Sequence, residues 1–216
     1  MKKQLLAAAV LAGISTAASA LPVVNGSFET GDFSGWNTST SSAGSATSVV
    51  TSDNGIAATD GSYFAAISGD ALMTQEQTWN AGDSVSFAFN FYGNDFEIND
   101  YSYFTVHDDV AGDTTLALAS IYPTATPDGK AFLSSGPYSS TDWQTFVYTF
   151  QTAGSGYIGF GVNNAVNTLS GSSLYVDNIT PTTSGPSSVP EPATFALFGL
   201  GLAGLGFSRR LQGAKK

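Results

Sequence analysis

Short runs of β-branched and aromatic residues follow one another along the chain between Thr47 and Ile179, separated by small and polar residues. The clearest run is Val85–Phe91, in which Val85, Phe87, Phe89 and Phe91 fall on one face and small or polar residues on the other. This alternation predicts a β-strand with one buried face. Gly, Asn, Asp and Ser interrupt such runs about every eight to twelve residues, and no run has helical spacing.

We predict about nine strands with no helix between them, a pattern that favours an all-β, antiparallel β-sandwich. The predicted strands are Thr47–Thr51, Tyr63–Ser68, Met73–Trp79, Val85–Phe91, Tyr101–His107, Thr115–Ile121, Trp143–Phe150, Tyr157–Asn163 and Leu174–Ile179. The Ser/Thr/Gly-rich stretch Asn37–Ala46 is predicted to be a surface loop, and Thr124–Gly136 is expected to be the longest insertion.

The first twenty residues have the composition of a secretory signal peptide. Lys2 and Lys3 precede an apolar stretch from Leu5 to Ile14, and the triplet Ala18-Ser19-Ala20 follows. This order is typical of signal peptides, and the apolar part is too short to cross ~30 Å of hydrocarbon. We predict a signal peptide over residues 1–20, with a mature chain that begins at Leu21. An uncleaved anchor is the alternative.

A second apolar segment lies near the C-terminus. A Thr/Ser/Gly/Pro-rich stretch leads into the motif Val189, Pro190, Glu191 and Pro192, and an apolar run then precedes Arg209 and Arg210. We predict a linker over residues 181–188, a transmembrane segment over 193–208 in the inner membrane, and a cytoplasmic tail over 211–216. Because arginines favour the cytoplasmic end of a transmembrane helix, we expect the domain to lie outside the cytoplasm.

The order of these parts resembles the PEP-CTERM sorting signal, here VPEP-ATFALFGLGLAGLGF-SRR over residues 189–210. In that family an exosortase, a membrane cysteine protease, is thought to cut near the Pro-Glu-Pro motif in bacteria that make exopolysaccharide. The resemblance implies an exported protein that is held transiently at the inner membrane and then reaches the cell surface or extracellular matrix. This tail departs from the shortest examples because Leu211–Lys216 follows the arginines. The alternative is an ordinary C-terminal anchor.

The remaining residues, 21–180, are enough for one domain with a hydrophobic core and too few for two. Lys130 is the one basic residue of this domain apart from His107, and it stands against sixteen acidic residues, a formal charge of −15. Phosphate contacts need Lys and Arg, so this charge excludes a conventional nucleic-acid partner. The acidity indicates either a protein kept soluble by charge or carboxylates joined by calcium.

Five short motifs follow one another along this domain. They are Asn25-Gly26-Ser27-Phe28-Glu29 with Gly31 and Gly35-Trp36, Asp60-Gly61-Ser62-Tyr63, Ala81-Gly82-Asp83-Ser84-Val85, Asp142-Trp143-Gln144 and Tyr175-Val176-Asp177-Asn178-Ile179. In this order they resemble carbohydrate-binding modules with the galactose-binding-like jelly roll, in which the first motif forms the opening strand. The resemblance implies a jelly-roll sandwich over residues 21–180.

A structural calcium commonly ties the first strand to the last in such modules. Carried over by motif, the resemblance implies Glu29 and Asp177 as its ligands, with Asn178 where a second acid is expected. Calcium takes six to eight oxygen ligands, so backbone carbonyls would have to complete the site. The alternative is that both carboxylates cap turns.

Candidates for catalysis are few. His107 is the only histidine, so no second imidazole can complete a metal site or a conventional relay with it. Asp95, Glu97 and Asp100 form the tightest acidic cluster, which provides carboxylate pairs for glycoside hydrolysis but is more simply an acidic loop. The domain has no cysteine nucleophile and no G-x-S-x-G motif. We therefore expect no enzyme.

The strand Tyr101–His107 carries the candidate binding residues. Phe104 and Val106 share one face of it, and Tyr101, Tyr103 and His107 share the other. If the apolar pair faces the core, the tyrosines face out and form, with Tyr92, a platform on which sugar rings stack. The alternative is tyrosines that pack at sheet edges. We expect an exported, non-catalytic protein that binds extracellular polysaccharide, or a structural or adhesive envelope protein without a small ligand.

Overall fold

The computed structural model describes residues 23–96, 100–122, 133–164 and 171–184. The chain divides into two compact units, Met1–Thr183 and Ser184–Lys216. The fold below is that of the first unit, and the predicted signal peptide, sorting motif and transmembrane segment all lie outside the described residues. In the part of the chain that is described, no helix is long and apolar enough to span a membrane.

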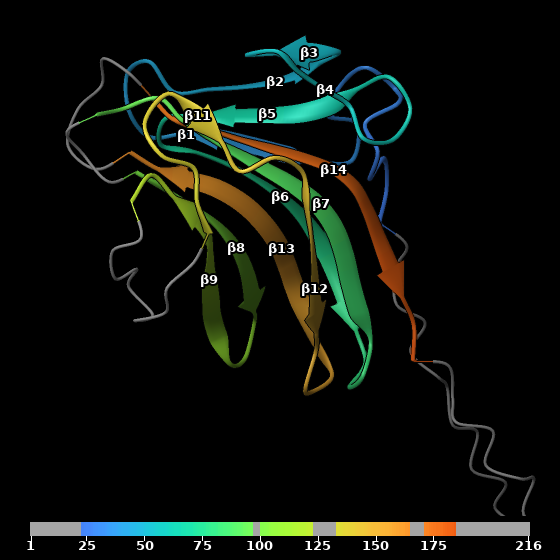
Figure 1. The fold of residues 1–216 in the computed structure, drawn as a ribbon. Coiled ribbons are helices and arrows are strands. Elements are labelled where there is room, and N and C mark those ends of the chain that lie inside the picture. Colours follow the sequence, from blue (N-terminus) through green and yellow to red (C-terminus); the bar gives the residue numbers. More distant parts are fainter. Residues whose placement is uncertain (1–22, 97–99, 123–132, 165–170, 185–216) are drawn as a thin grey trace, which may run out of the picture. The chain divides into compact units, whose positions relative to one another are not determined.

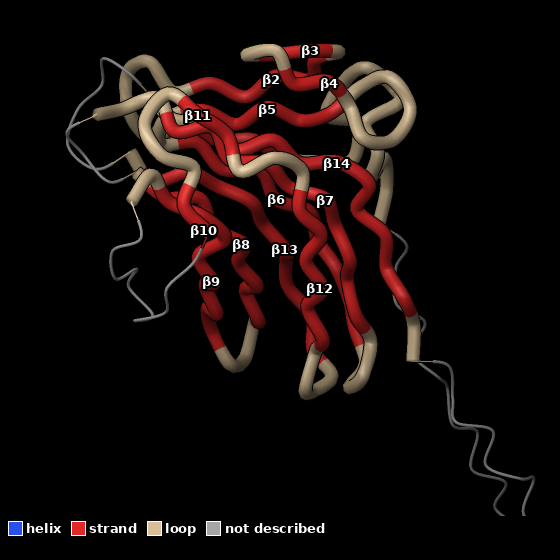
Figure 2. The backbone as a smooth tube through the Cα atoms, viewed as in Figure 1, coloured by secondary structure: helices blue, strands red, loops and turns tan. Residues whose placement is uncertain are grey.

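Two large antiparallel sheets make up the first unit, and Figure 2 shows strands and loops throughout its described part. The strands are β1 (Asn37–Thr40), β2 (Ala46–Val50), β3 (Ser52–Asp53), β4 (Ile56–Ala57), β5 (Phe64–Ser68), β6 (Ala71–Trp79), β7 (Ser84–Gly93), β8 (Tyr101–Asp108), β9 (Gly112–Ser120), β10 (Leu133–Ser134), β11 (Ser139–Ser140), β12 (Gln144–Thr149), β13 (Gly154–Asn163) and β14 (Ser173–Thr182). The predicted sandwich is confirmed, and within the described ranges no helix lies between the strands.

The first sheet has the strand order β1-β6-β13-β8-β9-β10, and the second has the order β11-β7-β14-β5-β2, with β12 also paired to β7. Among the described pairings only the short β9–β10 contact is parallel. The hairpin β3–β4 forms a small third sheet beside β2 and β5 (Figure 1). The chain thus crosses repeatedly between the two large sheets, as expected for a jelly-roll sandwich.

Aromatic side chains from both sheets fill the space between them. Met73, Phe87, Phe104 and Phe160 are fully buried, and the rings of Phe87 and Phe160 meet edge to face with their centroids 4.7 Å apart. Burial of a large apolar side chain contributes about 1.5–3 kcal/mol to folding, so these rings are a major source of stability. The apolar positions that predicted these strands are therefore the residues that form this core.

A smaller cluster of Phe64, Ala66 and Tyr175 lies on the outer face of the second sheet. Trp143 packs edge to face on Phe64, with ring centroids 5.8 Å apart, and the hairpin β3–β4 lies beside it. The buried Tyr175 hydroxyl donates a hydrogen bond to Asp53 Oδ2 (3.0 Å) and accepts one from Asn54 Nδ2 (2.7 Å). Trp143 and the hairpin β3–β4 therefore cover this part of the outer face.

All nine predicted strands are present, and two other predictions are wrong. Asn37–Thr40, predicted as loop, is strand β1 at the edge of the first sheet; all four residues are exposed, so no alternation marks them. Asn25–Glu29, expected as an opening strand, forms turns because Asn25 (φ 51°) and Phe28 (φ 58°) have left-handed backbone. At the other end, β14 continues to Thr182, beyond the predicted domain end at residue 180.

Candidate functional site

The outer face of the first sheet carries three of the four predicted ligand-binding residues. Phe104 and Val106 of β8 are buried in the core, with 0% and 4% of their surfaces exposed. Alternation along the strand therefore turns Tyr101, Tyr103 and His107 outward, where all three are half-buried. The predicted orientation of this strand is therefore confirmed. The side chains of Tyr101, Tyr103, His107 and Tyr157 are called the aromatic face below.

Tyr157 of β13 is the member that sequence reasoning missed. It lies directly opposite His107 in the β8–β13 register, and the two rings stack with centroids 4.8 Å apart and an angle of 14° between their planes. The signal was present in the sequence, because Tyr157, Gly159 and Gly161 alternate with the core residues of β13. Only the strand pairing, however, shows that Tyr157 meets His107.

Gly161 makes room for the ring of Tyr103, which lies opposite it in the register. A Cβ atom at Gly161 would lie 2.5 Å from both Cζ and the hydroxyl oxygen of Tyr103. Real Cβ atoms do not approach so closely, so the ring must lie across the glycine backbone. Tyr101 lies beside it, with ring centroids 6.2 Å apart. The half-buried Tyr103 ring therefore lies along the sheet instead of standing out from it.

A shallow pocket of about 270 Å³ adjoins Tyr103. Its lining combines the Tyr103 ring and Leu72 with the polar residues Ser39, Ser41, Asp70 and Asn163. The Asp70 carboxylate is held in place, because Oδ1 accepts a hydrogen bond from the Asn164 amide (2.7 Å) and Oδ2 accepts one from the Ser42 hydroxyl (2.8 Å). The pocket thus places fixed hydrogen-bonding groups beside an aromatic surface, as small polar ligands require.

Charged groups lie at the other end of the aromatic face. His107 Nδ1 is 2.7 Å from Asp113 Oδ1, and His107 Nε2 is 4.0 Å from Asp109 Oδ1. The hydrogen bond with Asp113 raises the pKa of His107 above its ordinary value. Burial raises the pKa of Tyr103, with smaller contributions from Tyr101 and Asp70, so this hydroxyl stays protonated. The tyrosine can therefore both donate and accept hydrogen bonds.

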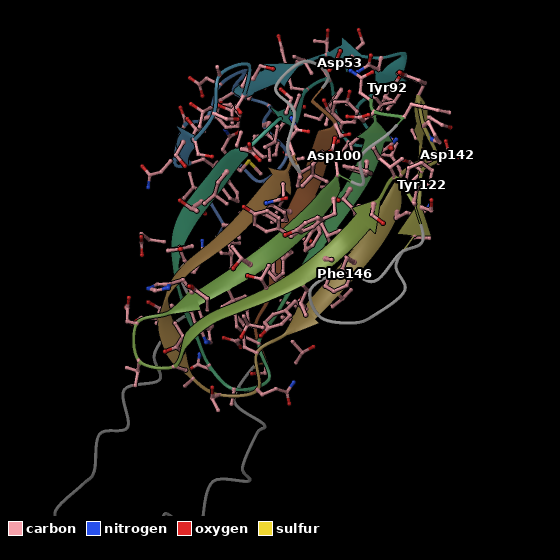
Figure 3. The ribbon with its side chains drawn as sticks, turned by 90° about the vertical axis from the view of Figure 1, so that its left-hand side faces the viewer. Asp53, Tyr92, Asp100, Tyr122, Asp142 and Phe146 are labelled. Atoms are coloured by element: carbon pink, nitrogen blue, oxygen red, sulfur yellow. The ribbon has the colours of Figure 1, made fainter. Side chains whose placement is uncertain are left out.

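Tyr92, the fourth predicted ligand-binding residue, belongs to the other sheet. It lies near the end of β7, opposite Ser173 of β14 and Ser140 of β11. Its half-buried ring packs against the cluster of Phe64, Ala66 and Tyr175. Figure 3 shows it at the end of the sandwich that also carries Asp53 and Asp142. The structure therefore does not bring Tyr92 together with the other three residues.

The predicted calcium ligands hold a loop of the backbone. Glu29 Oε1 accepts hydrogen bonds from the amides of Ser62 and Tyr63, both 2.8 Å long. Asp177 Oδ2 accepts two from the amides of Thr59 and Asp60, both 2.9 Å, and its Oδ1 accepts one from Asn178 (2.7 Å). Two carboxylates thus clamp residues 59–63 between the N-terminal turns and β14.

These contacts do not fit a calcium site as they stand. Five backbone N–H groups point at the two carboxylates, and the positive ends of those dipoles would face a cation. Within the described ranges no group of three or more His, Cys, Asp and Glu side chains could hold a metal ion. Burial raises the pKa of Asp177 against the opposing effect of its hydrogen bonds. Calcium stays a prediction, and the capping alternative accounts for the hydrogen bonds.

The acidic cluster near the start of β8 is in part internal. Asp95 and Asp100 are buried, with 6% and 0% of their surfaces exposed, whereas Glu97 lies outside the described residues. Asp100 Oδ2 accepts a hydrogen bond from the Ser172 hydroxyl (2.7 Å), which ties the start of β8 to the segment before β14. The sequence predicts an acidic loop for this cluster, whereas the structure buries both Asp95 and Asp100.

The family model described as the PEP-CTERM protein-sorting motif matches residues 188–210. The match begins one residue before the range predicted from the sequence and ends at the same arginine. The chain therefore carries a PEP-CTERM sorting motif, which indicates export and sorting at a membrane. No curated protein matches the chain.

Solved structures of similar fold include carbohydrate-binding modules and an adhesin domain. TmCBM61, solved in complex with beta-1,4-galactotriose, is 18% identical, with 74% of this chain and 97% of that chain covered and a TM-score of 0.46. The K3 adhesin domain of Lys-gingipain from Porphyromonas gingivalis is 16% identical (76% and 100% covered, TM-score 0.46). The CBM22-1 xylan-binding domain from Paenibacillus barcinonensis Xyn10C is 12% identical (72% and 89% covered, TM-score 0.39). Likeness at this level carries no argument about the ligand of this chain.

Proposed function

We propose that this chain is an exported, non-catalytic protein that binds polysaccharide on the aromatic face of its first sheet. One observation carries the proposal: the Tyr103 ring lies across Gly161, beside a pocket lined by serine hydroxyls, Asn163 and the Asp70 carboxylate. A ring that lies along the sheet offers its face to the C–H groups of a sugar. The polar lining provides partners for the sugar hydroxyls.

The shape of the site suits a chain of sugars better than a single small molecule. Tyr101 and Tyr103 are neighbours on β8, and the Tyr157–His107 stack lies farther along the same face. These rings are spread over two adjacent strands on an open sheet, whereas the pocket beside Tyr103 is shallow and about 270 Å³ in volume. An extended polymer can contact all of these groups at once, and several weak contacts then add to one useful affinity.

The sorting motif supports the cellular setting of this proposal. An exosortase is the proposed processing partner, and the apolar segment 193–208 is the proposed anchor in the inner membrane. After processing, the domain would lie at the cell surface or in the extracellular matrix, where the exopolysaccharide of the producing cell is the nearest polymer. The predicted calcium ligands Glu29 and Asp177 hold residues 59–63 and do not belong to the aromatic face, so the proposed binding does not depend on a metal there.

Affinity electrophoresis tests the proposal. The mature protein, purified from its cells in mild detergent, is run through gels with and without the exopolysaccharide of the producing bacterium. Retardation that depends on the polysaccharide concentration is the expected result, and release of reducing ends is not expected. Unretarded migration at every concentration would contradict the proposal and leave the structural or adhesive role.

A further inference from the structure

His107 is the only basic side chain among the described residues. Every lysine and arginine of the chain lies in ranges 1–22, 123–132 or 185–216, which the structure does not describe. The described part of the aromatic face therefore has no permanent positive charge. Since recognition of carboxylate or sulfate groups relies on Arg and Lys, the described part of this face, where His107 is the one side chain that can become positive, is poorly equipped to bind an acidic polysaccharide.

Carboxylates surround the same face. Glu76 of β6 lies opposite Tyr157, Asp113 of β9 lies opposite His107, and Asp70 lines the pocket beside Tyr103. These charges act on the aromatic hydroxyls: after burial, Asp113 and Glu76 raise the pKa of Tyr157, and Asp70 contributes to the raised pKa of Tyr103. Each end of the aromatic face thus has a negative charge next to a tyrosine.

Glu76 is the carboxylate that is free to meet a ligand. It is exposed on the outer face of β6, and it makes no hydrogen bond or ion pair with any described residue. Asp113, by contrast, is paired with His107, and Asp70 is held by Ser42 and Asn164. An ammonium group that approaches the Tyr157 ring would therefore meet an open carboxylate and the negative face of an aromatic ring together.

We propose that the aromatic face selects polysaccharides whose sugars carry free amino groups and rejects those whose sugars carry carboxylates. This inference rests on the proposed function, and it names the class of polymer that the same site takes. The ammonium groups gain Coulomb attraction from Glu76 and Asp70, whereas a uronate is repelled by both. Neutral glycans, which gain only the stacking contacts, are expected to bind with intermediate affinity.

Calorimetric titration with three soluble oligosaccharides of equal length tests the selection. The probes are a glucosamine oligomer, its N-acetylated form and an oligogalacturonate, at mildly acidic pH and low salt. The expected order of affinity is glucosamine, then N-acetylglucosamine, then galacturonate. An oligogalacturonate that binds as tightly as the neutral probe, or no binding of any probe, would overturn the inference. Retardation of the protein in the exopolysaccharide gels would in either case leave the proposed function intact.

A pair of variants distinguishes binding at the aromatic face from non-specific electrostatic attraction between an acidic protein and a basic glycan. Glu76→Gln removes the open carboxylate, and Asp142→Asn makes the same change of charge near β12 of the second sheet. Since an exposed ion pair contributes ~0.2–1 kcal/mol, Glu76→Gln should weaken glucosamine binding by a factor of about 1.4 to 5. It should leave the neutral probe unaffected. Equal losses in Glu76→Gln and Asp142→Asn would overturn the assignment.

Discussion

The ring of Tyr103 lies across the backbone of Gly161, on the adjacent strand of the first sheet. This relationship explains why the central strand β13 has a glycine at an outward position, where a side chain would ordinarily be free to point to solvent. The glycine leaves a depression that the tyrosine fills, so the ring becomes part of the sheet surface. The proposed polysaccharide site depends on this arrangement.

Gly161→Ala should weaken polysaccharide binding although it leaves every aromatic residue in place. The new Cβ would lie 2.5 Å from the Tyr103 ring and displace it from the sheet. We expect a loss of about tenfold in affinity, which corresponds to ~1.4 kcal/mol, measured by affinity electrophoresis. Tyr103→Phe is the control, because it keeps the ring and should keep most of the affinity. Wild-type affinity in Gly161→Ala would show that the position of the ring does not matter.

His107 should titrate above its ordinary pKa of 6.5, because its ring bonds to the Asp113 carboxylate at 2.7 Å. The chain has a single histidine, so its ring protons can be followed by NMR without assignment. The Asp113→Asn variant should return the pKa toward 6.5, whereas Asp109→Asn, at 4.0 Å from the ring, should move it less.

The same pair makes stability depend on pH. A histidine that binds its proton more tightly in the folded state stabilises the fold below its unfolded pKa of 6.5. That contribution is lost as the pH rises through the raised pKa of the folded state. Denaturant melts over this range should show the decline in the wild type and a smaller one in Asp113→Asn. Equal pH dependence in both proteins would contradict the account.

Asp177→Asn should destabilise the domain through the loop at residues 59–63. The carboxylate accepts three backbone hydrogen bonds, and the amide nitrogen of an asparagine would face at least one of those donors. A hydrogen bond to a charged group contributes ~1.5–3 kcal/mol, so we expect a loss of about this size in the free energy of unfolding. Glu29→Gln is the control, because one amide oxygen can still accept the hydrogen bonds of Ser62 and Tyr63.

Calcium removal should leave the melting temperature unchanged. Backbone amides of residues 59–63 already bond to Glu29 Oε1 and to Asp177 Oδ2, and the described residues contain no group of three or more His, Cys, Asp and Glu side chains that could hold a metal ion. Thermal melts with EDTA and with added calcium, together with elemental analysis, provide the test. A higher melting temperature with calcium, or calcium that copurifies in a one-to-one ratio, would establish the metal that the family resemblance implies.

The mature protein should end near Pro190-Glu191-Pro192. The sorting motif over residues 188–210 indicates processing at a membrane, and cleavage there would remove the apolar segment and the arginines. Intact-mass analysis of the cell-associated protein measures both ends at once, because signal-peptide removal should leave Leu21 as the first residue. A product that still ends at Lys216 would contradict processing by an exosortase.

The fold could be predicted from the sequence because each strand that packs into the sandwich core has apolar residues at alternate positions. Phe87 and Phe104 point into the space between the sheets while their sequence neighbours point outward, and this alternation of facing indicated both strands. Strand β1 shows no such alternation, because its four residues are exposed and the strand is held by backbone pairing with β6. Edge strands without a buried face are invisible to an argument from periodicity.

The candidate site was predicted only within one strand. Alternation placed Tyr101, Tyr103 and His107 on a common face, which the structure confirms. Tyr92 was added because it is close in sequence, but β7 belongs to the opposite sheet. Tyr157 was missed for the converse reason: it is distant in sequence, and only the register between β8 and β13 brings it to His107. Contacts across strands require the sheet order, which no local pattern reveals.

Two tyrosines on opposite sheets provide the most direct test of the proposed site. The dissociation constants of Tyr103→Ala and Tyr92→Ala for the same exopolysaccharide are compared with that of the wild type, after melting curves show that both variants are folded. We expect a loss of about tenfold (~1.4 kcal/mol) in Tyr103→Ala and wild-type affinity in Tyr92→Ala. Full affinity in Tyr103→Ala, or an equal loss in both variants, would contradict binding at the aromatic face.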